Sequence, residues 1–159
     1  MKMIVPVLAG LLMVAGCQSA KGSMPITALP QALSSGGTVT GVTLANTPGG
    51  VGGGFRDAFQ SGVMSSMQQC ATGATPLTVR VTLDGYQAAN PGLALFAPSQ
   101  SQISGVATLY DAEGTEVGRY RIRRSFTMGG VGGMVAAAGA EKMMIDHFGD
   151  ELCKQAFAD

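Results

Sequence analysis

Apolar positions recur at two different periods along the chain, and the two periods predict strands and helices in turn. Every second residue from Leu77 to Leu83 is apolar, which predicts a half-buried strand. Three further strands are predicted over 38–44, 103–110 and 117–126, because these segments are rich in β-branched and aromatic residues. The turn-forming residues 111–116 then join the last two strands as a hairpin.

Two segments instead have apolar residues at helical spacing. Phe55, Phe59, Val63 and Met67 predict an amphipathic helix over 55–70. A second, longer helix follows the glycine-rich residues 129–133, and its apolar face consists of Val135, Ala138, Ile145, Phe148, Leu152 and Ala156. The predicted order is β-α-β-β-β-α, an α+β fold in which both helices pack on one face of a four-stranded mixed sheet. Its first two strands should be parallel, since a right-handed crossover joins them.

The N-terminal residues have the pattern of a bacterial lipoprotein leader. Lys2 precedes an apolar run over 3–15, which is shorter than the about 20 residues that a membrane-spanning helix needs. The run ends in a sequence that resembles the lipobox, Val14-Ala15-Gly16-Cys17. We therefore expect a signal peptide over 1–16, cleaved before Cys17, and acyl chains on that cysteine that anchor the protein to a membrane.

The remaining chain divides at residue 37 by composition. Residues 17–37 are rich in serine, glycine and proline, so they predict an acylated cysteine followed by a flexible tether. Residues 38–159 then form a single domain of ordinary size. Gln18 stands where an aspartate would retain such a lipoprotein at the inner membrane. We therefore expect the chain to face the periplasm, at the outer membrane rather than the inner one.

Two further cysteines predict a disulfide bond in this oxidising compartment. Cys70 ends the first predicted helix, and Cys153 lies near the end of the second. Both helices follow strands that run in the same direction, so the two cysteines should lie at the same end of the domain. Two separate buried thiols are the alternative.

Composition argues against several classes of activity. The 10 basic and 10 acidic residues give no net charge, which is unlike a nucleic-acid-binding protein. The glycine-rich residues 49–54 lack the Gly-Lys-Ser/Thr ending of a nucleotide-binding P-loop. His147 and Glu151 have the spacing of two metal ligands on a helix, but no other histidine exists to complete a zinc site. A serine hydrolase would need His147 beside an elbow such as Gly-x-Ser-x-Gly, and no such motif occurs. We expect no catalysis, no metal and no cofactor.

Two surfaces are candidates for binding a partner. Alternation places Arg119, Arg121 and Arg123 on the sheet face that the helices leave open, and Arg80 of the second strand joins them. This candidate partner-binding face would suit an acidic protein or lipid headgroups, although a solvated face is the plainer alternative. The second candidate is the loop over 86–101, whose residues Leu93, Leu95 and Phe96 form an apolar run that either packs down or meets a partner.

The lipobox, the small-residue tether and one β-α-β-β-β-α domain together resemble a group of small uncharacterised bacterial lipoproteins. In plan, this group is similar to auxiliary lipoproteins of envelope transport and to the N-terminal domain of TolB-like proteins. The resemblance supplies no catalytic residue. From the chain as a whole we expect a lipid-anchored periplasmic binding or assembly module of the cell envelope, with an envelope protein as its partner and no catalysis. The alternative is a structural subunit of an oligomeric envelope complex.

Overall fold

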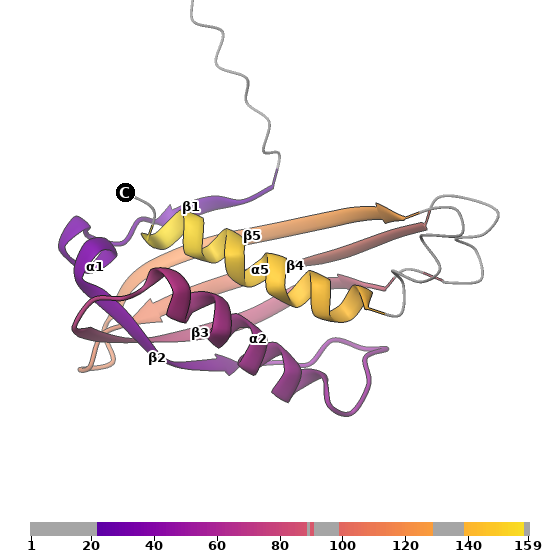
Figure 1. Ribbon diagram of the computed structural model, residues 1–159, viewed down its shortest axis with the longest axis horizontal. Helices are drawn as coiled ribbons and strands as arrows, with labels where there is room; N and C mark the ends of the chain where they lie inside the picture. Colours follow the sequence, from indigo (N-terminus) through magenta and orange to yellow (C-terminus); the bar gives the residue numbers. More distant parts are fainter. Residues whose placement is uncertain (1–21, 89, 91–98, 129–138, 158–159) are drawn as a thin grey trace, which may run out of the picture.

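Five strands form one sheet, and two long helices lie side by side across one of its faces (Figure 1). The computed structural model describes residues 22–88, 90, 99–128 and 139–157. The strand order across the sheet is β1-β5-β4-β3-β2. The elements are β1 (Met24–Thr27), α1 (Gln31–Gly36), β2 (Gly37–Leu44), α2 (Phe55–Cys70), β3 (Thr75–Gln87), β4 (Ser99–Tyr110), β5 (Glu116–Met128) and α5 (Ala140–Phe157).

The α+β class and the predicted order of the main elements are confirmed. β2 and β3 are parallel and are joined through α2, while β4 is antiparallel to both of its neighbours, β3 and β5. The strand count is corrected, because the sheet has five strands and not four. The additional strand is β1, which pairs antiparallel with β5 and forms an edge of the sheet.

The flexible tether predicted up to residue 37 is wrong from β1 onward. The hydroxyl of Ser23 donates to the backbone carbonyl of Arg123 (3.2 Å) and accepts from its N–H (3.1 Å), which fixes the start of β1 against β5. Past β1, the N–H of Leu29 donates to the buried hydroxyl of Tyr120 at 2.6 Å. Because the side chain of Leu29 is also buried in the core, this segment belongs to the domain.

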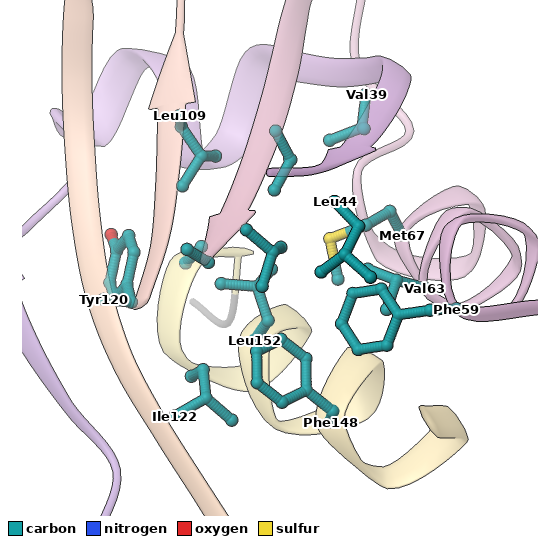
Figure 2. Packing of buried hydrophobic residues seen from close by; sticks show 14 of the residues in the cluster. Val39, Leu44, Phe59, Val63, Met67, Leu109, Tyr120, Ile122, Phe148 and Leu152 are labelled. Carbon is teal, nitrogen blue, oxygen red and sulfur yellow. The ribbon is translucent and has the colours of Figure 1, made fainter. Parts of the chain in front are cut away.

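The hydrophobic core lies between the sheet and the helices. Phe59, Val63 and Met67 of α2 meet Phe148 and Leu152 of α5 above the strands (Figure 2). The sheet contributes Leu44, Leu109, Tyr120 and Ile122, whose side chains are almost wholly buried. Each such side chain contributes about 1.5–3 kcal/mol by its removal from water. The alternating face predicted for 77–83 is confirmed, since Leu77, Val79, Val81 and Leu83 are all buried.

The two helices run in the same direction and approach closely because of small residues between them. A Cβ atom on Gly149 of α5 would lie 2.7 Å from the Cβ of Ser66 in α2, and one on Gly62 would lie 2.5 Å from Ile145 Cγ2. Glycine therefore sets the separation of the helices at both points. Within the described residues, no helix is both long and apolar enough to span a bilayer.

Candidate functional site

The sheet face turned away from α2 and α5 is covered by no other described element, and we call it the open face. It is lined by alternate side chains of the three central antiparallel strands. From β3 come Thr78, Arg80, Thr82 and Asp84; from β4 come Ser104, Val106 and Thr108; from β5 come Arg119, Arg121 and Arg123.

A β-bulge places one carboxylate in the middle of the open face. The register of β3 against β4 shifts between Leu83 and Gly85, so Asp84 has no direct cross-strand partner. Its Oδ1 accepts a hydrogen bond from the hydroxyl of Ser104 (2.6 Å), and its Oδ2 accepts from Arg121 Nη1 (2.7 Å). The Ser104 hydrogen bond and the Arg121 guanidinium hold the pKa of the Asp84 carboxyl below its ordinary value of 3.8.

The four predicted arginines do come together on the open face, but they differ in their partners. Arg119 Nη2 lies 2.6 Å from Glu116 Oε2, and Arg121 is paired with Asp84. Arg80 and Arg123 have no ion pair within the described part of the chain. The open face therefore carries two arginines in ion pairs and two without one among the described residues.

A shallow hollow of about 370 Å³ lies where the open face meets β1. Gly22, Met24, Ser104, Arg121 and Arg123 line it. Met24 lies directly opposite Arg121 in the β1–β5 register, which places its side chain on the same side of the sheet. The hollow thus combines an apolar edge with two guanidinium groups: Arg121 forms an ion pair with Asp84, and Arg123 is near enough to help lower the pKa of the Asp84 carboxyl.

A second hollow, of about 400 Å³, lies on the helix side of β5. Arg124 Nη1 lies 3.3 Å from Glu151 Oε2, and the Glu151 residue is 8% exposed. The ring of His147 packs against Phe126, with 4.8 Å between the ring centroids. Ser66, Gln69, Arg124, His147, Asp150, Cys153 and Lys154 line this hollow.

This second hollow offers no metal site of the kind that the His147–Glu151 spacing allowed. Glu151 is turned to Arg124 and also accepts a hydrogen bond from Gln155 Nε2 at 3.1 Å. Asp150 Oδ1 accepts a hydrogen bond from the hydroxyl of Ser66 at 3.0 Å. Within the ranges described above, no three His, Cys, Asp or Glu side chains are grouped so that they could hold a metal ion.

A disulfide bond joins the two helices beside this hollow. Cys70 is the last residue of α2 and Cys153 lies in the last turns of α5, and their Cα atoms are 6.1 Å apart. The predicted pairing is confirmed, since the parallel helices bring both residues to the same end of the domain. The bond closes a loop over a sequence separation of 83 residues.

Several predicted positions lie outside the described residues. These are the signal peptide over 1–16, the lipid-attachment residue Cys17, the apolar loop residues Leu93, Leu95 and Phe96, and the helix-face residues Val135 and Ala138. Their roles stay predictions, as does partner binding by the open face.

Sequence reasoning missed three features of the surface: the Asp84–Arg121 ion pair, the Arg124–Glu151 ion pair, and the edge strand β1 with its exposed apolar residues. The ion pairs join residues on different elements, and their partners depend on strand register and helix position. For β1 a weak signal existed, because Met24 and Ile26 alternate with Pro25 and Thr27 in a segment otherwise poor in large apolar residues.

Comparison with known proteins shows similarity of structure without detectable similarity of sequence. No family model and no curated protein matches the chain. A candidate lipoprotein from Caulobacter crescentus CB15 aligns with 71% of this chain and 82% of its own, at 15% identity and a TM-score of 0.41.

A subunit of the PelC dodecamer from Paraburkholderia phytofirmans aligns more fully. The match covers 84% of this chain and 96% of that chain, at 14% identity and a TM-score of 0.55. A single-site variant of the same dodecamer matches with a TM-score of 0.54. The chain therefore has a fold similar to that of the PelC subunit, and the match covers almost the whole of that subunit.

Proposed function

We propose that this protein is a lipid-anchored structural subunit of an oligomeric assembly in the bacterial cell envelope, attached to the membrane through Cys17. One observation carries the proposal: the fold is similar to that of a subunit of a dodecamer, over 96% of that subunit. The lipobox resemblance at residues 14–17 supports the envelope location and the anchor.

The open face suits contact between copies. It extends over the three central strands, and some of its polar side chains are joined in ion pairs that can exchange partners across an interface, as in Asp84–Arg121. Arg80 is exposed and forms no ion pair with any described residue. The carboxylates of Asp57 and Glu113 are also exposed, and neither forms an ion pair with a described residue. A head-to-tail contact between such unlike surfaces is the kind that closes a ring.

Native mass measurement of the acylated protein in detergent tests this proposal. We expect a closed oligomer of one defined stoichiometry, and we expect Arg80→Glu to convert it largely to smaller species. The matched control is Lys142→Glu, which reverses a charge on α5 in the opposite layer, where the Lys142 side chain is 81% exposed and forms an ion pair with Asp146. A monomer at all concentrations would contradict the proposal and favour a binding module that acts on a different envelope protein.

A further inference from the structure

Two large apolar side chains are exposed on the edge strand β1. Met24 is 55% exposed and Ile26 is 50% exposed, and they are the exposed large apolar residues among those that the structure describes. Isolated exposed apolar residues are common, but these two lie two residues apart on the same short strand. β1 is an edge strand of the sheet (Figure 1), so both side chains belong to one edge, and we call this pair the apolar strip.

The charge around this strip is positive. Arg123 lies beside the start of β1, where a Cβ atom on Gly22 would be 3.1 Å from the Cβ of Arg123. Arg123 has no ion pair among the described residues, and it lines the same hollow as Met24. The sequence from Cys17 to Arg56 contains no aspartate or glutamate. An apolar strip flanked by cations matches the boundary between acyl chains and phosphate groups in a bilayer.

The chain itself limits how far this edge can lie from the membrane. Cys17 and Gly22 are five residues apart, so a fully extended link reaches at most about 18 Å. The headgroup layer takes up about 5–7 Å of that distance on each side of a bilayer. Arg123 is therefore held within roughly one to two Debye lengths of the lipid phosphates.

A second copy of the chain suits this edge less well than a membrane does. Pro25 lies in the middle of β1, and the register of β1 against β5 shifts between Pro25 and Thr27. Proline has no N–H to donate, and an irregular, proline-containing edge resists the addition of another strand. A lipid surface needs no such backbone pairing.

We infer that the β1 edge is a membrane-contact surface, with Met24 and Ile26 in the headgroup region and Arg123 against lipid phosphates. The occupant is the bilayer to which Cys17 is attached, so the inference rests on the lipid anchor of the proposed function. It adds an orientation to that function, since the domain then lies with one sheet edge on the membrane.

The absence of tryptophan from the chain makes this contact measurable. Ile26→Trp introduces a single fluorophore at the β1 edge, and Thr43→Trp introduces one at an exposed position of β2, the opposite edge of the sheet. Each acylated variant is reconstituted into vesicles of phosphatidylethanolamine and phosphatidylglycerol, with or without bromine on the acyl chains near the headgroups. We expect brominated lipid to lower the Ile26→Trp emission about twofold and to leave the Thr43→Trp emission unchanged.

The other outcomes separate the contact from the anchor. If bromine left the emission of both variants unchanged, in protein that intact mass shows to be acylated, the membrane contact would be overturned and the anchor would stand. The Ile26→Trp emission could instead shift to the blue with rising protein concentration and not respond to bromine. That result would assign the β1 edge to contact with a second copy, and it would also overturn the membrane contact. Protein without acyl chains would overturn the anchor and the contact together.

Discussion

At the scale of single residues, the open face is organised around Asp84. Its carboxylate joins β4 through Ser104 and β5 through Arg121, so one side chain links three strands on the face opposite the core. Alternation along β3 predicts that residue 84 faces away from the helices, but it does not predict these partners. They follow from the β-bulge at Leu83/Gly85, which displaces Asp84 from the regular ladder.

Asp84→Asn should lower stability at neutral pH and have no effect at low pH. The pKa of Asp84 is lowered in the folded state, so its stabilising contribution is fully present above the unfolded value of 3.8 and is lost as pH falls through the lower folded pKa. Because Asp84 and Arg121 have side chains 44% and 46% exposed, solvent screens the pair, and we expect a loss of under about 1 kcal/mol at pH 7.

Urea unfolding of Asp84→Asn and the natural protein at pH 7 and near pH 2.5 measures this difference. Arg121→Gln is the matched change in the partner and should show the same pH dependence. A difference between Asp84→Asn and the natural protein that persists unchanged at acid pH would show that the hydrogen bonds, and not the charge, stabilise this cluster.

At the scale of elements, the sequence predicted the core elements closely and missed the edge. The helix predicted over 55–70 begins and ends where α2 does, because Phe55, Phe59, Val63 and Met67 keep one buried stripe. β1 escaped prediction because its apolar alternation extends over only four residues, and none of them is buried in the core that the other strands share. Its place in the sheet comes from Ser23 and from the contact of Leu29 with Tyr120, which are tertiary interactions.

The disulfide between α2 and α5 should stabilise the domain by roughly 2–5 kcal/mol, because it closes a long loop in the unfolded chain. Urea unfolding of the natural protein with and without reductant measures this contribution. The Cys70→Ser, Cys153→Ser double variant should match the reduced protein and be insensitive to reductant. Two free thiols in protein purified without reductant, found by alkylation and intact mass, would contradict the bond.

At the scale of the whole molecule, the proposed anchor at Cys17 would limit where the domain can lie. β1 begins seven residues after Cys17, so an acylated Cys17 would hold the domain at the bilayer surface and not at the end of a twenty-residue tether. The open face adjoins this edge through Arg121 and Arg123, so copies anchored side by side would present their open faces at one height above the membrane.

Cys17→Ser should remove the acyl chains and leave the leader uncleaved, because the thiol is the acceptor of the lipid. Intact mass and labelling with a fatty-acid analogue in the expressing cells measure both effects. Cys70→Ser is the matched control, since it removes a cysteine elsewhere and should leave acylation unchanged. Normal lipid labelling of Cys17→Ser would contradict the assignment of the lipobox.

The pairing of β1 with β5 also has a consequence for the order of folding. Ser23 bonds to Arg123 across a sequence separation of 100 residues, so β1 lacks its partner in the sheet until β5 has emerged. During synthesis or export, β1 therefore stays unpaired while α2, β3 and β4 can already associate. Throughout that interval the apolar side chains of Met24 and Ile26 lie on an unpaired segment, next to the residue that would receive the lipid. Completion of the sheet is thus a late event, in which the beginning of the chain docks onto a nearly finished domain.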